Sequence, residues 1–193
     1  MSLSEDGRLI SQIRQGNILA LKALYEKHKV LVYRTALAIT HDRAAAEDIL
    51  QDCFLKVYTH IDRLDGSLPL SPWLHRVTVN LSYNWANKRR RWLKPFEDVI
   101  DHLAAGPRTL PESILERGEV QRVIQKAIAS LRFKHRVVIV LFYLNGFSLN
   151  EIAYILDCPV GTVKSRLYYA RRNLRRKLER DRRLSPEVAY EFS

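Results

Sequence analysis

The sequence predicts an all-α protein made of two small helical domains joined by a flexible linker, the second ending in a helix-turn-helix. Apolar residues recur mainly at spacings of three and four, and the 193 residues include only seven Gly and seven Pro. Basic charge falls in two blocks, about +5 over residues 1–92 and about +8 over residues 113–193, with about −2 between them. We therefore predict domains at 1–92 and 113–183, a linker at 93–112, and a tail at 184–193.

The composition limits the classes of function. A net charge of +11 and a pI near 9.9 favour a polyanionic partner such as nucleic acid. With neither a long apolar run nor a signal peptide in the sequence, we expect a cytoplasmic protein with no membrane insertion. Cys53 and Cys158 are far apart and are predicted to be reduced thiols. No catalytic motif or paired Cys/His cluster is present, so we expect no enzyme activity, metal, cofactor or small-molecule substrate.

Three helices are predicted before residue 62. The first covers residues 5–15 and ends at Gly16, Asn17 caps a second that runs to about residue 39, and Asp42 caps a third. Helical spacing predicts these buried positions: Leu21, Leu24, Tyr25, Leu31, Val32 and Leu37 in the second helix, and Ile49, Cys53, Phe54, Val57, Tyr58 and Ile61 in the third.

A fourth helix follows the 62–72 loop and is predicted to start at Ser71 and Pro72. Its core positions are Trp73, Leu74, Val77 and Leu81, and four cations, residues 88–91, close it beside Trp92. Cations at a helix C-terminus stabilise the helix by roughly a few tenths of a kcal/mol, which is one explanation of the cluster. The other is single-stranded DNA, which binds basic side chains interleaved with aromatic rings.

The second domain is predicted to hold a helix at about 112–130 and another at about 134–144, with Val137, Val138, Val140, Leu141 and Leu144 inward. Two more helices follow between residues 147 and 178. Ser148 and Glu151 form a capping box, Asp157 suits the turn, and Pro159 is placed at the first position of the last helix.

The last helix separates into an apolar and a basic face. Val163, Leu167, Ala170, Leu174 and Leu178 mark the buried face, and Lys164, Ser165, Tyr168, Tyr169 and Arg172 lie opposite, flanked by Arg166, Arg171, Arg175 and Arg176. Such a face also occurs on ordinary helical hairpins as a solvated surface. The capping box, the short turn and the Pro start together favour a helix-turn-helix that enters the major groove of DNA.

Three strings resemble bacterial sigma-70-type factors, in particular the small extracytoplasmic-function (ECF) group. EIAYILDCPVGTVKSRLYYARRNL is similar to their fourth conserved region, with residues 161–166 on its most specific part. AAAEDILQDCFLKVY resembles the helix that docks on a coiled coil of the largest RNA polymerase subunits, and SPWLHRVTVN resembles the helix that reads and melts the minus-ten element. Further along the same predicted helix, Asn84 and Asn87 depart from the family pattern. The loop before this helix, with the sequence SLPLS, departs from it as well.

The resemblance implies three binding surfaces. Core polymerase is contacted by Asp48, Gln51, Asp52 and Lys56. The minus-ten element is contacted by Asp65, Gly66, Ser67, Ser71, Arg76, Asn80, Tyr83, Lys88, Arg89 and Arg90. The minus-thirty-five element is contacted by Lys164, Ser165, Arg166, Tyr168, Tyr169, Arg171, Arg172 and Arg175.

The implied partners are core RNA polymerase, promoter DNA and an anti-sigma factor. The alternative function is a helix-turn-helix regulator that binds duplex DNA without acting as a polymerase subunit. The N-terminal part separates the two, because a response regulator would carry alternating strands and helices there, whereas residues 1–92 are helical throughout and carry an acidic face.

Overall fold

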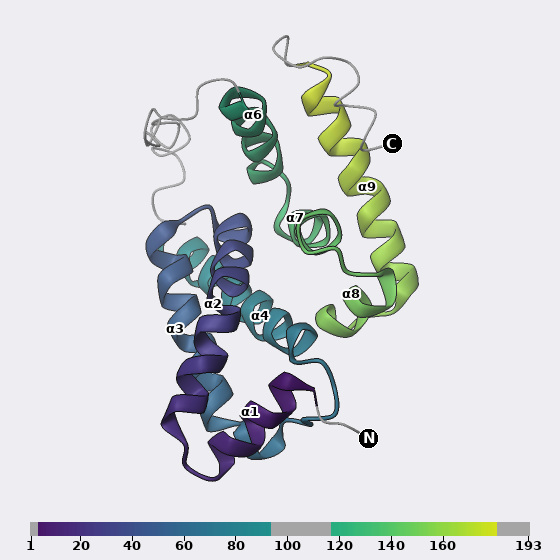
Figure 1. The fold of residues 1–193 in the computed structure, drawn as a ribbon. Coiled ribbons are helices and arrows are strands. Elements are labelled where there is room, and N and C mark those ends of the chain that lie inside the picture. The colour runs from purple at the N-terminus through teal and green to yellow at the C-terminus, as the bar shows by residue number, and fades with distance from the viewer. Residues whose placement is uncertain (1–3, 94–116, 181–193) are drawn as a thin grey trace.

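The structure is a computed structural model that describes residues 4–93 and 117–180, and every regular element in these two ranges is a helix (Figure 1). We call residues 4–93 the N-terminal lobe and residues 117–180 the C-terminal lobe. Apart from Leu93, the predicted linker at 93–112 and the tail at 184–193 lie outside the described residues.

The N-terminal lobe is built around one long helix. Helix α2 (Ile18–Thr40) packs against α1 (Glu5–Arg14), α3 (Arg43–Thr59) and α4 (Leu70–Leu93), and a short 3₁₀ turn, η1 (Ile61–Arg63), follows α3. The predicted caps are confirmed: the Asn17 side chain accepts hydrogen bonds from the amides of Leu19 and Ala20, and Asp42 accepts one from Ala45. These local bonds define where α2 and α3 begin.

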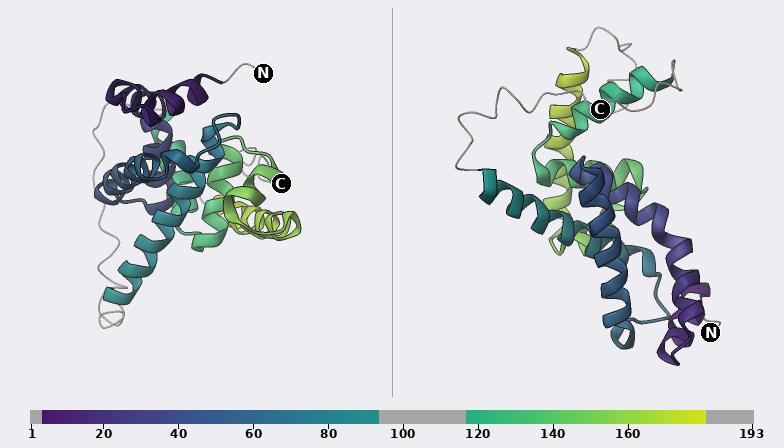
Figure 2. Two further views of the ribbon diagram at one scale, coloured as in Figure 1. Left: turned by 90° about the horizontal axis from the view of Figure 1, so that it is seen from below. Right: turned by 90° about the vertical axis from the view of Figure 1, so that its left-hand side faces the viewer.

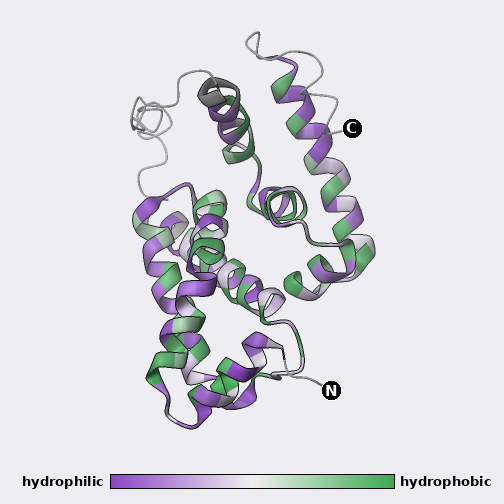
Figure 3. Ribbon diagram, viewed as in Figure 1, coloured by the Kyte–Doolittle hydropathy of each residue, from purple (hydrophilic) through white to green (hydrophobic). Residues whose placement is uncertain are grey.

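The C-terminal lobe contains four helices and one π turn. Helices α6 (Arg117–Ala129), α7 (Phe133–Ile139) and α8 (Leu149–Leu156) all contact α9 (Val160–Leu178), and the π turn η3 (Val140–Leu144) continues α7. The predicted apolar face of α9 is confirmed, since its five residues are all buried: Val163, Leu167, Ala170, Leu174 and Leu178. Hydrophilic and hydrophobic bands alternate along this helix (Figure 3).

Four sequence expectations are wrong in detail. Leu144 and Tyr58 were expected inside but are 56% and 55% exposed. The π turn at Val140–Leu144 adds a residue to one helical turn, so the side chain of Leu144 leaves the buried stripe of α7. Tyr58 lies at the edge of the α3 stripe, one residue beyond the fully buried Val57. Pro159 is the N-cap of α9, so the helix begins one residue later than predicted, at Val160. Helix α4 begins at Leu70, one residue before the predicted start at Ser71, so the last two residues of the predicted 65–71 loop belong to its first turn.

The two lobes are in contact. Ile39 of α2 and Val79 of α4 belong to the same buried cluster as the core of the C-terminal lobe, and α4 packs against α8. The last turns of α4 extend away from the other helices (Figure 2). None of the described helices is both long and apolar enough to cross a lipid bilayer.

Candidate nucleic-acid interface

The helix-turn-helix is held together by local hydrogen bonds. The Ser148 side chain accepts from the Glu151 amide at 3.3 Å, and the Glu151 carboxylate accepts from the Ser148 amide at 2.8 Å, so the predicted capping box is present. The Ser148 hydroxyl also donates to this carboxylate at 2.7 Å, and the bonds from the hydroxyl and the amide lower the pKa of Glu151 below its usual value. Asp157 adopts the left-handed conformation (φ 50°) that ends α8 and turns the chain into α9. Local signals in the sequence therefore fix where α8 begins and where the chain turns into α9.

The outer face of α9 is open to solvent. We use this name for five exposed residues that lie opposite the buried stripe: Lys164, Ser165, Tyr168, Tyr169 and Arg172. The rings of Tyr168 and Tyr169 meet edge to face with centroids 5.4 Å apart. Two aromatic rings beside two cations offer apolar contact to base edges as well as charge for phosphates, which is the chemistry of a helix in a major groove.

The three flanking arginines of the predicted site are half-buried. Arg166 donates to the Cys158 sulfur at 3.8 Å, and Arg175 pairs with Glu179 at 2.7 Å. The Arg171 guanidinium lies over the rings of Phe142 and Tyr143, 5.3 and 5.5 Å from their centroids. Their contacts fix the positions of these three cations, whereas the residues of the outer face remain exposed.

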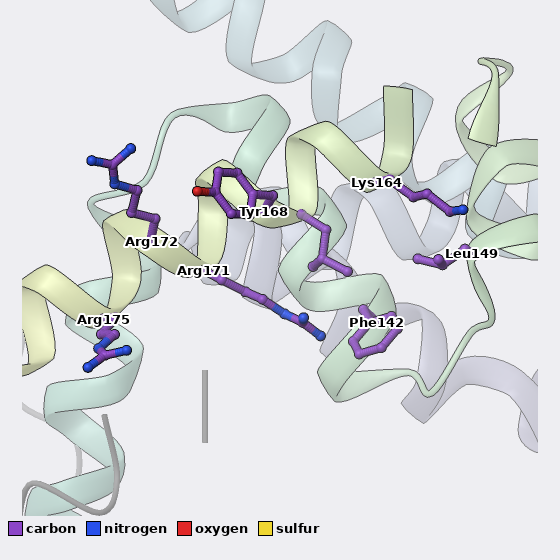
Figure 4. Close-up of a pocket in the computed structure, with 8 residues that line it drawn as sticks. Phe142, Leu149, Lys164, Tyr168, Arg171, Arg172 and Arg175 are labelled. Carbon is purple, nitrogen blue, oxygen red and sulfur yellow. The ribbon is translucent and has the colours of Figure 1, made fainter. Parts of the chain in front are cut away.

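A hollow runs along one side of α9 (Figure 4). It has a volume of about 580 Å³, and Phe142 and Leu149 form an apolar wall opposite cations of α9. The complete lining is Phe142, Leu149, Lys164, Leu167, Tyr168, Arg171, Arg172 and Arg175. Five of the eight predicted minus-thirty-five residues therefore meet at one concave surface.

The second predicted DNA surface combines the 65–71 loop with one face of α4. The loop is anchored at both ends by the buried Leu64 and Leu70, and its middle is exposed. The Asp65 carboxylate accepts hydrogen bonds from the Ser67 amide (2.9 Å) and hydroxyl (2.7 Å), which lower the pKa of Asp65. Leu68, which sequence reasoning did not select, is 58% exposed at the tip of this loop.

Further along α4 the predicted residues differ in their surroundings. Asn80 and Lys88 are exposed, and Arg89 stacks over Trp85 at 5.3 Å and lies 3.7 Å from the Asp42 carboxylate. The side chain of Arg90 is not among those described. The basic end of α4 is therefore exposed at Lys88 and partly engaged at Arg89.

Arg76 and Tyr83 face the other lobe. The Arg76 guanidinium pairs with Asp157 at 3.1 Å, donates to the Tyr154 carbonyl at 3.4 Å, and lies over the Tyr154 ring at 5.6 Å. Tyr83 meets Phe133 edge to face at 5.6 Å. Two of the predicted minus-ten residues are thus in contact with the C-terminal lobe in this arrangement.

Buried side chains reinforce the same contact between the lobes. The ring centroids of His75, in α4, and Phe147 are 4.6 Å apart. The Nδ1 atom of His75 is hydrogen-bonded at 2.7 Å to the backbone carbonyl of Ser71, another predicted minus-ten residue. Burial lowers the pKa of His75, so the imidazole is neutral at physiological pH. Asn145 donates to the Thr35 hydroxyl at 3.0 Å, and Arg136 donates to the Ile39 carbonyl at 2.6 Å.

The predicted protein-binding surface lies on α3. Asp48, Gln51, Asp52 and Lys56 are all exposed along the outside of this helix. Leu55, which sequence reasoning did not select, lies among them and is 60% exposed. A single exposed apolar residue is common on protein surfaces, so the support for a protein partner comes from the acidic charge of this face. Within residues 4–93 and 117–180 no group of His, Cys, Asp and Glu side chains is placed to hold a metal ion.

Two parts of the chain match known families. The family described as Sigma-70 region 2 matches residues 24–92, and the family described as Sigma-70, region 4 matches residues 121–174. The chain is 33% identical to the ECF RNA polymerase sigma factor SigW of Bacillus subtilis over 181 residues, which cover 88% of this chain and 94% of that protein.

Two solved structures resemble the fold over most of its length. The sigma factor RpoE of Bartonella quintana, in complex with the anti-sigma factor NepR, superposes with a TM-score of 0.64 at 26% identity, covering 89% of this chain and 99% of that one. CnrH in complex with the cytosolic domain of CnrY gives a TM-score of 0.66 at 28% identity, covering 92% and 99%.

Proposed function

Because the chain belongs to the ECF group of the sigma-70 family of RNA polymerase sigma factors, we propose that it directs core polymerase to promoters through three surfaces, one for polymerase and two for DNA. In this function the polymerase supplies the catalysis, and the sigma factor supplies recognition. The alternative, a regulator that binds duplex DNA alone, is not favoured, because the relatives match both lobes and not only the helix-turn-helix.

Recognition of the minus-thirty-five element is assigned to the outer face of α9. The observation that carries the proposal is the separation of roles on this helix: five apolar residues are buried and five polar or aromatic residues are exposed on the opposite side. Lys164, Ser165 and Tyr168 would reach base edges near the N-terminal half of α9, as recognition helices do. Arg166, Arg171 and Arg175 would contact phosphates, which position the helix without reading sequence.

Recognition of the minus-ten element is assigned to the 65–71 loop and to the α4 face that carries Asn80. A base that leaves the duplex needs a site that receives it, and the exposed loop between two anchored leucines supports such a site. Lys88 and Arg89 at the end of α4 would follow the phosphates of the unpaired strand.

Docking on core polymerase is assigned to the α3 face that contains Asp48, Asp52 and Leu55. An acidic patch on a chain of net charge +11 repels DNA and suits a protein partner, and Leu55 gives the interface an apolar centre. The two DNA surfaces lie on other helices, so one molecule could bind polymerase and promoter together.

Separation of the two lobes is part of the proposed mechanism. Arg76 and Tyr83 contact α8 and α7 and are only partly exposed, so separation of the lobes would uncover the rest of both side chains for the minus-ten strand. Both solved relatives are complexes with a partner protein: RpoE of B. quintana with the anti-sigma factor NepR, and CnrH with the cytosolic domain of CnrY. We propose an anti-sigma partner for this chain too, and a cytoplasmic location, where polymerase and promoter DNA are found.

The test is transcription with purified components. Core polymerase plus this chain would be supplied with linear templates randomised at both promoter elements, and the transcripts sequenced. The proposal predicts start sites at a fixed distance from two enriched elements, and no enrichment with core polymerase alone. Enrichment of a single duplex site by the chain without polymerase, and none in the transcripts, would instead establish the duplex-binding regulator.

A further inference from the structure

Helix α1 makes close contact with the loop assigned to the minus-ten element. It lies before residue 24, where the match to the region 2 family begins, and it carries none of the predicted site residues. In Figure 1 it lies at the end of the N-terminal lobe that is distant from α6 and α9. Two of its residues touch the backbone of the loop or of the turn that leads into it.

The first contact joins two glycines. A Cβ atom built on Gly7 would lie 2.1 Å from the Gly66 carbonyl oxygen, and one built on Gly66 would lie 3.2 Å from the Gly7 Cα. The first distance is too short for any side chain, so α1 and the loop approach this closely only because residue 7 has no Cβ. The hydroxyl of Ser4, which caps α1, lies 3.5 Å from the same carbonyl.

The second contact is a set of hydrogen bonds from Arg14. Its Nε donates to the Ile61 carbonyl at 3.1 Å, and its Nη2 donates to the carbonyls of Asp62, at 3.5 Å, and Leu64. These carbonyls belong to η1 and to the residue that precedes the loop. A planar guanidinium with several donors is suited to holding such a turn in one conformation, and its charge strengthens each bond.

Helix α1 is itself fixed to the rest of the lobe. Ile10 and Ile13 are buried in the same cluster as Leu64 and Leu70, the two residues that anchor the loop. On its other side, Asp6 pairs with Lys27 at 2.8 Å and with His28 at 3.1 Å, so α1 is tied to α2. Burial would raise the pKa of Asp6, but the hydrogen bonds from Lys27 and His28 lower it below its usual value, so Asp6 is ionised at neutral pH and its bond to Lys27 is charge-assisted.

We infer that α1 is a positioning element for the 65–71 loop, in which Arg14 and Gly7 hold the loop backbone in the conformation that selects the minus-ten base. Neither residue touches DNA in this account. The inference rests on the proposed role of the loop, and it adds a determinant of promoter selectivity that lies outside the region 2 match.

The experiment uses holoenzyme reconstituted from core polymerase and variant chains, on templates randomised only in the minus-ten element. The variants are Arg14→Ala, Arg14→Lys and Gly7→Ala. Arg8→Ala is the matched control, because it removes the same charge from an exposed position of the same helix. Leu68→Ala reports on the loop itself. Thermal unfolding and affinity for core polymerase are measured for every variant, so that loss of folded protein is separated from loss of selection.

We expect Arg14→Ala to reduce discrimination between the best minus-ten sequence and its single-base variants by about tenfold, with affinity for core polymerase unchanged. Arg14→Lys keeps the charge but not the fork of donors, so it should restore selection only in part. Gly7→Ala should alter selection at least as much as Arg14→Ala, because the new methyl group must displace Gly66. Arg8→Ala should match the unmodified chain.

Three results would overturn the inference. If Leu68→Ala changes selection while Arg14→Ala only lowers the thermal midpoint or reduces transcription from all sequences alike, then Arg14 has a structural role alone and the proposed function of the loop stands. If neither variant changes selection, the assignment of the loop to the minus-ten element fails as well. If Arg8→Ala changes selection as much as Arg14→Ala, then the charge of α1 is responsible and not its contact with the loop.

Discussion

The two surfaces assigned to DNA differ in what already covers them. The outer face of α9 is exposed along its length and backed by a continuous buried stripe. The face of α4 is exposed at Asn80 and Lys88, but Arg76 and Tyr83 are in contact with the C-terminal lobe. The same molecule thus presents one surface ready to bind and another that is partly covered by α7 and α8.

The difference suggests an order of events. In the proposed function, α9 would bind the minus-thirty-five element without any change inside the C-terminal lobe, whereas full use of the minus-ten surface would require release of Arg76 from Asp157 and Tyr154. The side chain of Asp157 is 81% exposed, so this ion pair is screened by water and contributes little by itself. The buried contacts between His75 and Phe147, and between Val79 and the C-terminal core, hold the lobes together more strongly.

The largest expected effect tests whether the lobes are separate folding units. Leu174→Ala should lower the free energy of unfolding of the C-terminal lobe by about 2–5 kcal/mol, because Leu174 of α9 is fully buried in the core of this lobe. Leu24→Ala is the matched change in the N-terminal lobe, where Leu24 is equally buried. Hydrogen exchange followed by mass spectrometry should show loss of protection confined to the lobe that carries each substitution. Equal loss in both lobes after either change would mean that they unfold as one unit.

Each lobe carries one cysteine, and the reactivity of the two thiols compares how tightly the two lobes are packed around them. Burial raises the pKa of the Cys53 thiol to about 11, while Cys158 is half-buried in the helix-turn-helix. At pH 8 only about 0.1% of a thiol with this pKa is ionised, and Cys53 is also less exposed than Cys158, so we expect iodoacetamide to label Cys158 first. Peptide mapping of the labelled protein gives both rates. Labelling of Cys53 at the rate of Cys158 would contradict a packed N-terminal core beneath α3.

Local signals in the sequence predicted much of this fold. Ser148 with Glu151, Asn17 and Asp42 each form their bonds within three residues, so the helix starts could be inferred without knowledge of the rest of the chain. Helical periodicity likewise identified the buried stripe of α9. Periodicity failed at Leu144, because the π turn changes the number of residues per turn and leaves no local sequence signal.

What the sequence could not predict depends on contacts between distant residues. Arg76 meets Asp157 across 81 positions of the chain, and Arg14 meets Leu64 across 50. Neither pair has a spacing or a motif that links it, so the covering of α4 and the contact between α1 and the loop required the structure. Leu55 was missed for a different reason: apolar residues on a helix are usually assigned to its buried side.

On the outer face of α9, Tyr168→Ala should reduce sequence preference in the minus-thirty-five element. The difference in binding free energy between the preferred base pair and the others, at the position that Tyr168 contacts, should fall by about 1–3 kcal/mol. A binding selection with randomised minus-thirty-five duplexes and holoenzyme measures this change. Arg175→Ala is the contrasting variant: it should weaken binding to all sequences alike and reduce the slope of log affinity against log salt by about 1. An unchanged sequence preference for Tyr168→Ala would show that α9 enters the groove in another rotation.

The smallest expected effect concerns the covered surface. Asp157→Asn removes the charge that faces Arg76, and Asn tolerates the left-handed conformation at this turn. We expect transcription at limiting concentrations of the chain to rise about two- to threefold, as the loss of one exposed ion pair would allow. A double-mutant cycle with Arg76→Ala, which removes the cation of this pair, separates the loss of the pair from a general gain in DNA affinity. Additive effects in that cycle would mean that the pair does not hold the lobes together.

The central claim is that α4 and α8 are in contact in the free chain and separate on the promoter. Spin labels at Lys22 and Asn150, both exposed and outside the proposed surfaces, allow the distance between the lobes to be measured by pulsed electron resonance in a Cys158→Ser background. We predict one short distance for the free chain and a longer one in the complex with core polymerase and promoter DNA. The same short distance in both states, with transcription intact, would contradict the account.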